Sequence, residues 1–235
     1  MTRTTQVHSA DQYAAETARW ISGVIASALM HRERCSIALC GGSTPVPVLR
    51  ALATLPVDWA KVDIFFGDER CVAPDHPDSN YGMACAAILD RITIAPGQVH
   101  RMQGEAHDPA AAALAYEALL PDAFDLLLLG TGPDGHTASI FPGSPAVRET
   151  RVRVLAVAAP RSPLLPAVAR ITITPPVIAA ARTIGMMVTG ASKASIVATL
   201  LDGPDHPMDH PAQLARRGTW LLDDAAASHL QPQDT

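Results

Sequence analysis

The chain has 235 residues, of which 48% are hydrophobic and 17% charged, a composition typical of a globular protein with a sizeable core. Eighteen basic against 23 acidic side chains give a net charge of −5, which argues against nucleic acid as a partner, because phosphate backbones bind basic surfaces. No apolar run approaches the length of a membrane span and the N-terminus lacks a signal-peptide pattern, so we expect a cytoplasmic protein without membrane contact.

Secondary-structure elements follow one another in a regular order along the chain. Apolar periodicity and capping residues predict helices over residues 11–29, 46–55, 79–88, 108–120, a short one from Pro175, and one around 193–201. Short apolar runs predict strands over residues 35–40, 62–66, 125–129, 152–158, 171–174, 184–188 and 219–222. This alternation predicts an α/β fold: a doubly wound, mostly parallel Rossmann-like sheet with helices on both faces, in a single domain.

A glycine pair follows the first of these strands. Gly41, Gly42, Ser43 and Thr44 lie between the strand and a helix for which Thr44 fits the N-cap and Pro45 the first position. Free backbone N–H groups and the positive end of the helix dipole form a cradle for a phosphate monoester. The glycine spacing is neither that of a P-loop nor that of a dinucleotide fingerprint. The alternative is a plain strand-to-helix turn with a capping hydroxyl.

Charged residues follow the strand over residues 62–66. Arg70 offers a fork to a carboxylate or phosphate, and Asp68 or Glu69 either holds Arg70 in place or acts on substrate protons. The alternative is the solvated start of a loop. The proline- and aspartate-rich residues 71–80 form a candidate lid over a bound substrate.

Four leucines at 126–129 predict a strand buried on both faces, and a glycine-rich turn follows it. Asp134 and His136 lie in this turn, at the carboxyl edge of the predicted sheet, where open α/β folds bind ligands. We expect Thr137 to cap a helix that begins at Ala138. Histidine ordinarily titrates near neutrality, so His136 is a candidate general base, with Asp134 orienting it. The alternative is a structural, hydrogen-bonded histidine.

Lys193 follows another strand and turn, and would add a positive charge at the same edge; the alternative is a solvated surface lysine. His206 and His210 lie in a proline-rich loop, which favours solvent exposure over a metal site. The cysteines show neither a C-x-x-C pair nor metal-ligand spacing, and predict reduced thiols: Cys35, Cys40, Cys71 and Cys85.

Four segments together are similar to the 6-phosphogluconolactonase family, part of a superfamily shared with glucosamine-6-phosphate deaminase. They are Gly-Gly-Ser-Thr-Pro at 41–45, Phe-Phe-Gly-Asp-Glu-Arg at 65–70 with Asp-Ser-Asn-Tyr at 78–81, Gly-Thr-Gly-Pro-Asp-Gly-His-Thr-Ala-Ser-Ile-Phe-Pro-Gly at 130–143, and Arg-Ile-Thr at 170–172 with Gly-Ala-Ser-Lys at 190–193. The resemblance implies hydrolysis of 6-phospho-D-glucono-1,5-lactone in the pentose phosphate pathway, without a metal or organic cofactor. The expected partner is this sugar-phosphate lactone, and the expected state a monomer or weak homo-oligomer.

The resemblance also implies residue roles. His136 is the general base, assisted by Asp134, and Arg70 is a substrate-anchoring cation in the catalytic set. The implied substrate and phosphate contacts are Gly41, Gly42, Ser43, Thr44, Asp68, Arg170 and Lys193, although Arg170 either lies in the site or braces it. Water attacks the carbonyl directly, and either glycine N–H groups of residues 130–135 or Arg70 stabilise the oxyanion. Ser139 is disfavoured as a nucleophile because it lacks a G-x-S-x-G setting.

Two alternatives remain. The deaminase family resembles Asp-Gly-His-Ile-Ala-Phe-Asn-Glu-Pro in this turn, with the glutamate assisting its histidine, and usually has an aromatic residue where this chain has Arg70. Here no carboxylate follows His136 until Glu149, so both positions favour the lactonase. A non-catalytic sugar-phosphate sensor is the second alternative, and the intact Asp134 and His136 argue against it.

Overall fold

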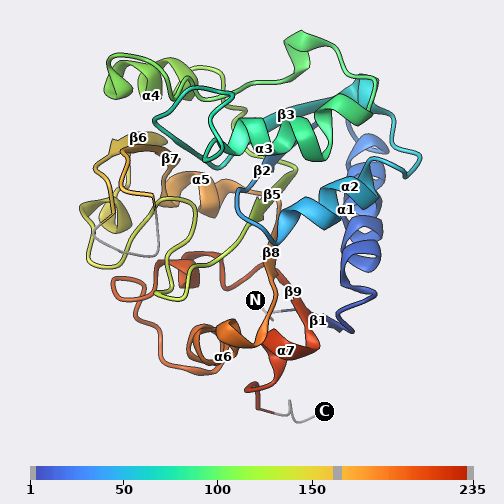
Figure 1. Cartoon of the computed structure of the whole chain (residues 1–235), viewed down its shortest axis with the longest axis vertical. Coiled ribbons are helices and arrows are strands. Elements are labelled where there is room, and N and C mark those ends of the chain that lie inside the picture. Colours follow the sequence, from blue (N-terminus) through green and yellow to red (C-terminus); the bar gives the residue numbers. More distant parts are fainter. Residues whose placement is uncertain (1–3, 161–165, 232–235) are drawn as a thin grey trace.

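A parallel six-stranded sheet forms the centre of the computed structural model, which describes residues 4–160 and 166–231 (Figure 1). The strands lie in the order β1-β9-β8-β5-β2-β3, and every neighbouring pair is parallel. Their bounds are β1 Thr4–His8, β2 Cys35–Leu39, β3 Val62–Phe66, β5 Leu126–Leu129, β8 Thr183–Val188 and β9 Thr219–Asp223. From β2 the chain continues outward to β3, whereas β5 and the later strands lie on the other side of β2. The order therefore reverses between β2 and β5, which is where open α/β sheets bind ligands.

Helices cover both faces of this sheet, as the sequence predicts. One core contains side chains of α1 (Tyr13–Leu29), α2 (Pro45–Leu52) and α3 (Asn80–Ala87). The other contains side chains of α4 (Pro109–Glu117), α5 (Pro175–Ala180), α6 (Ala194–Asp202) and α7 (Asp224–Ala227). Successive strand residues alternate between the two cores, for example Leu126 and Leu128 in the first, Leu127 and Leu129 in the second. Among the helices within residues 4–160 and 166–231, none is long and apolar enough to cross a bilayer.

A second, antiparallel sheet of three strands lies beside the large one. It consists of β4 (Asp68–Arg70), β7 (Arg170–Ile173) and β6 (Val154–Val157), in the order β4-β7-β6. The sequence predicts β6 and β7 as strands but does not predict β4, which is three charged residues long. Since strand β4 pairs Arg70 directly with Arg170, the small sheet brings two guanidinium groups to one place.

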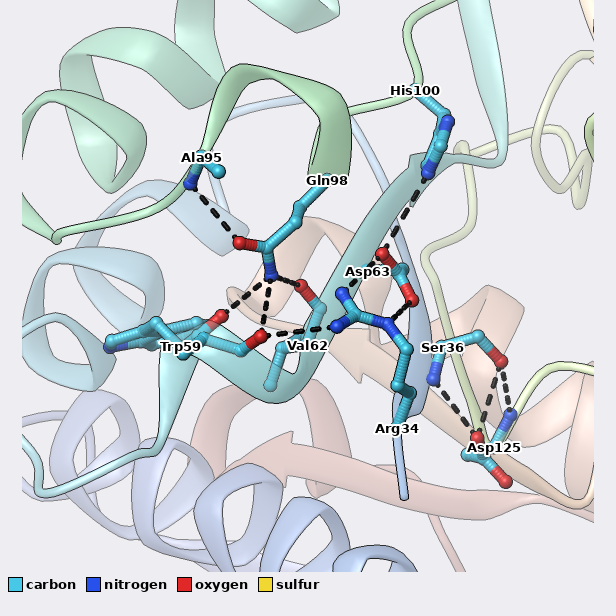
Figure 2. Close-up of polar contacts among 10 residues, drawn as sticks. Arg34, Ser36, Trp59, Val62, Asp63, Ala95, Gln98, His100 and Asp125 are labelled. Carbon is cyan, nitrogen blue, oxygen red and sulfur yellow. Dashed lines mark hydrogen bonds and ion pairs between the residues drawn. The ribbon is translucent and has the colours of Figure 1, made fainter. Parts of the chain in front are cut away.

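Polar contacts fix the strands at the amino-terminal edge of the large sheet (Figure 2). Arg34 donates two hydrogen bonds to the Asp63 carboxylate, at 2.6 and 2.7 Å, which ties the start of β2 to β3. The Asp125 carboxylate accepts from the backbone N–H of Ser36 at 2.9 Å and from its hydroxyl at 3.2 Å, which ties β5 to β2. Because these contacts set the register at one end of the strands, they also fix how the carboxyl ends align.

Two of the four cysteines lie in the core. Cys35 is fully buried in β2, and Cys40, just beyond this strand, is 7% exposed; all four cysteines are free. Burial raises the pKa of both thiols to about 12, so they remain protonated and unreactive near neutral pH.

Candidate active site

A pocket of about 490 Å³ lies at the carboxyl ends of β2, β5 and β8, next to the small sheet. A cavity of this size accommodates one small metabolite. The structure brings to its wall all the predicted site residues except Glu69 and Asp134: Gly41, Gly42, Ser43, Thr44, Asp68, Arg70, His136, Arg170 and Lys193. Asp134 lies directly behind His136 and contacts its ring. The pocket therefore lies at the carboxyl edge of the sheet, where the sequence predicts it.

The glycine cradle, residues 41–44, forms the wall that follows β2. Gly42 has φ +96°, a conformation that favours glycine, and Pro45 begins α2 as expected. Within the described residues, the backbone N–H groups of Gly42, Ser43 and Thr44 have no acceptor in the protein. Thr44 holds the N-cap position without capping through its side chain, because its hydroxyl lies 2.9 Å from that of Thr189. The cradle can therefore donate several hydrogen bonds to an anion.

His136 and Asp134 form a hydrogen-bonded pair on the opposite wall. Nδ1 of His136 lies 2.6 Å from Oδ1 of Asp134, which also accepts the backbone N–H of His136 at 3.2 Å. Burial alone would raise the pKa of Asp134, but the hydrogen bond and the charge of His136 hold it below its ordinary value. Since an ionised carboxylate only accepts hydrogen bonds, this contact favours the imidazole tautomer that has its proton on Nδ1.

The helix expected after Thr137 does not form. Thr137 instead bridges to Ile140 in a tight turn, with Ala138 at φ +47°, and its hydroxyl donates to the carbonyl of Gly130 at 2.9 Å. The prediction was wrong because the residue before a proline is disfavoured in helical conformation, and Phe141 precedes Pro142 only four residues after Thr137. The resulting turn folds back on itself and fixes the backbone beside His136.

The His136 imidazole packs so closely against Gly132 that a side chain at this position would collide with the ring. The sequence did not indicate this requirement. A Cβ atom at Gly132 would lie 2.2 Å from both Nδ1 and Cε1 of His136 and 2.5 Å from Oδ1 of Asp134. We therefore expect Gly132→Ala to displace the ring and lower kcat roughly 100-fold, with KM changed far less. Steady-state kinetics check this, with Gly97→Ala as control because a Cβ at Gly97 has no neighbour within 4 Å. An unchanged kcat in Gly132→Ala would contradict the tight fit.

The proline-rich loop of residues 202–211 and the turn after it support the turn over residues 130–140, which carries His136. The backbone N–H of Ala212 donates to the Gly135 carbonyl at 2.9 Å, and that of Gly143 donates to the Met208 carbonyl at 2.7 Å. His206 is exposed as expected, whereas Nδ1 of His210 is buried near Gly135. Across residues 4–160 and 166–231, no three histidine, cysteine or acidic side chains are grouped as metal ligands would be.

Three cations line the pocket. Arg70 donates to the Asp78 carbonyl at 2.5 Å, and Lys193 donates to the Thr131 carbonyl at 3.0 Å. Burial lowers the pKa of Lys193, which the charge of Asp134 partly opposes, and burial likewise lowers the pKa of Arg170, which is only 2% exposed. In the part of the chain that the structure describes, none of the three forms an ion pair with a carboxylate. Their charge is thus available to an anionic ligand.

Glu69 serves the fold, since its buried carboxylate does not line the pocket. It accepts the backbone N–H groups of Asn80 at 2.7 Å and Tyr81 at 2.8 Å, and the Ser79 hydroxyl at 3.0 Å. Burial is the main reason that its pKa is raised, although these hydrogen bonds oppose the shift. Ser79 caps α3 as predicted, through the N–H of Gly82. Glu69 thereby fixes the start of α3 against β4 and the backbone of Arg70, to which it is also bonded.

Comparison with known proteins gives one consistent result. Residues 8–222 match the family model described as glucosamine-6-phosphate isomerases/6-phosphogluconolactonase. The chain is 41% identical over 228 residues to a 6-phosphogluconolactonase of Mycobacterium leprae, covering 89% of this chain and 91% of the relative. It is 38% identical over 221 residues to that of Synechocystis sp., covering 88% and 90%. The solved 6-phosphogluconolactonase of Trypanosoma brucei superposes with a TM-score of 0.85 at 33% identity, over 98% and 99% of the two chains.

Proposed function

Since the chain belongs to the family of glucosamine-6-phosphate isomerases and 6-phosphogluconolactonases, we propose that its pocket uses His136 to activate water against a sugar-phosphate lactone. The activity is that of its curated relatives, hydrolysis of 6-phosphogluconolactone to 6-phosphogluconate in the pentose phosphate pathway. The observation that carries the mechanism is the 2.6 Å contact between His136 and Asp134 in the same pocket as an anion cradle.

The phosphate binds at the glycine cradle and Lys193. The N–H groups of residues 42–44 supply directed donors, the dipole of α2 points its positive end at them, and Lys193 adds a full charge. Arg170 adds a second cation on the small sheet. Because the phosphate is remote from the reacting carbonyl, this binding energy orients the lactone ring toward His136.

Nε2 of His136 takes a proton from a water molecule as the water oxygen attacks the lactone carbonyl. The carbonyl becomes a tetrahedral oxyanion; when it collapses, the bond from C1 to the ring oxygen breaks and the imidazolium returns its proton to that oxygen. Two glycine N–H groups are already used within the turn, since Gly132 donates to the His136 carbonyl and Gly135 to that of Gly132. This favours Arg70 as the group that stabilises the oxyanion.

The glutamate that assists the histidine in the deaminase family has no counterpart in this pocket. Glu149, the first carboxylate after His136, accepts backbone N–H groups of residues 150–152 at 2.7–3.0 Å and does not line the pocket. Those hydrogen bonds, above all from Arg151, also hold its pKa below the ordinary value, so it stays ionised. Ring opening assisted by a glutamate beside His136 therefore has no support in this pocket.

Parallel assays of the two activities test the function. Acid release from 6-phosphogluconolactone is followed in a pH-stat and corrected for spontaneous hydrolysis, and ammonia release from glucosamine 6-phosphate is measured with the same preparation. We expect rapid lactone hydrolysis and no ammonia. Ammonia without lactone hydrolysis would indicate the deaminase, and neither activity would indicate a sensor.

Substitution of Lys193 tests the phosphate anchor. We expect Lys193→Ala to raise KM roughly 10- to 100-fold, because a hydrogen bond to a charged group is lost, with a smaller decrease in kcat. Lys61, the only other lysine, is exposed and paired with Asp58, which makes Lys61→Ala a matched control. Initial rates over a range of lactone concentrations give both constants. Unchanged kinetics in Lys193→Ala would place this lysine outside the binding site.

A further inference from the structure

Ser139 is completely buried three residues after His136, and its hydroxyl contacts a carboxylate of the pocket. It donates to Oδ2 of Asp68 at 2.6 Å, the separation of a charge-assisted hydrogen bond. Its backbone N–H donates to the Thr172 hydroxyl at 3.0 Å, which ties the catalytic turn, residues 130–140, to β7. A hydroxyl used in this way and closed off from solvent is not a nucleophile. It instead connects the catalytic turn with strand β4.

Asn80 contacts the same carboxylate from the other side. Its Nδ2 donates to the backbone carbonyl of Asp68 at 2.8 Å and to Oδ1 at 3.0 Å, and its side chain is 1% exposed. The carboxamide also lies against the glycine cradle, since a Cβ atom at Gly41 would be 1.8 Å from Oδ1 of Asn80. Asn80 thus connects Asp68 with the proposed phosphate anchor. Both oxygens of Asp68 have a donor, one from Ser139 and one from Asn80.

We propose that Ser139 and Asn80 are positioning residues that act through Asp68. Together they make its carboxylate a bridge between the turn that carries His136 and the cradle that holds the phosphate. The bridge sets the distance between the imidazole and the anchored end of the substrate, and this role rests on the proposed lactonase function. Because a donor holds each of its two oxygens, the Asp68 carboxylate is fixed in place between the two segments.

The test compares kcat with KM in two Ser139 variants. Ser139→Ala removes the donor to Asp68, and we expect kcat to fall roughly 10- to 100-fold because the catalytic turn shifts, with KM nearly unchanged because Asn80 still supports the cradle. Ser139→Cys keeps a donor, although the thiol is a weaker donor and slightly larger, and is expected to lie between wild type and Ser139→Ala. Ser228→Ala, an exposed serine after α7, is the matched control. Denaturant unfolding of each variant measures how much folded enzyme the assay contains.

A double-mutant cycle tests whether the two residues act through one carboxylate. We expect Asn80→Ala mainly to raise KM, and the loss of kcat/KM in the double variant to be smaller than the product of the two single losses. Wild-type kcat in folded Ser139→Cys and Ser139→Ala, or losses that multiply, would overturn the proposal. Equal changes in kcat and KM that vary across the variants only with their stability toward denaturant would also overturn the proposal. If Ser139→Ala does not fold, Ser139→Cys decides. A wild type without lactonase activity would instead contradict the proposed function.

Discussion

Replacing His136 with alanine is expected to lower kcat for the lactone by roughly two to four orders of magnitude, the range typical of a lost general base. KM should change little, because the cradle and Lys193 remain intact. The fold should also remain, since the ring is half-buried and its side chain contacts Asp134 and packs near Phe141 at the pocket wall. Initial rates after subtraction of spontaneous hydrolysis measure the loss.

The matched control is His31→Ala, an exposed histidine just after α1. It should retain wild-type kinetics. Circular dichroism and denaturant unfolding of both variants separate a loss of chemistry from a loss of structure. A folded His136→Ala enzyme with undiminished kcat would rule out the imidazole as the base.

Asp134→Asn is expected to cause the second large loss, roughly 10²- to 10⁴-fold in kcat. An asparagine is nearly the same size but can donate its N–H₂ to Nδ1, which favours the tautomer with the proton on Nε2. The ring would stay in place without a basic nitrogen facing the substrate. The lowered pKa of Asp134 keeps the wild-type carboxylate ionised as pH falls, so its orienting role is present throughout the neutral range.

Asp122→Asn is the control for this exchange, because Asp122 is exposed in the loop that leads to the amino end of β5. It should leave kcat and KM at wild-type values. KM is expected to stay close to wild type in Asp134→Asn also, since Asp134 does not line the pocket. An Asp134→Asn enzyme with wild-type kcat would show that the carboxylate does not govern the state of the imidazole.

The strands buried on both faces could be read from sequence because their apolar runs are continuous. The four leucines of β5 are the clearest case, and all four are fully buried. Strands β1 and β4 could not be predicted: β1 is a partly exposed edge strand, and β4 consists of charged residues whose extended form depends on pairing with β7. Pattern and propensity carry no information about such distant partners.

The location of the site followed from the carboxyl ends of parallel strands, which gather Gly41, Lys193 and His136 at one edge. The contact between Ser139 and Asp68 could not be predicted, because the two residues are 71 positions apart and nothing in either segment indicates that they pair. Likewise the need for glycine at position 132 depends on where the His136 ring lies. The turn after Thr137 was mistaken for a helix because the hydroxyl that suits an N-cap also bonds the Gly130 carbonyl.

The proposed mechanism requires that Asp134 holds the His136 proton on Nδ1 and leaves Nε2 free to activate water. Long-range ¹⁵N–¹H correlation NMR on ¹⁵N-labelled protein observes this tautomer directly, with His136→Ala identifying the signals. We expect Nδ1–H and an unprotonated Nε2 in the wild type at the pH of full activity, and the reverse tautomer in Asp134→Asn. An Nε2–H tautomer in the fully active wild-type enzyme would rule out this role of Asp134.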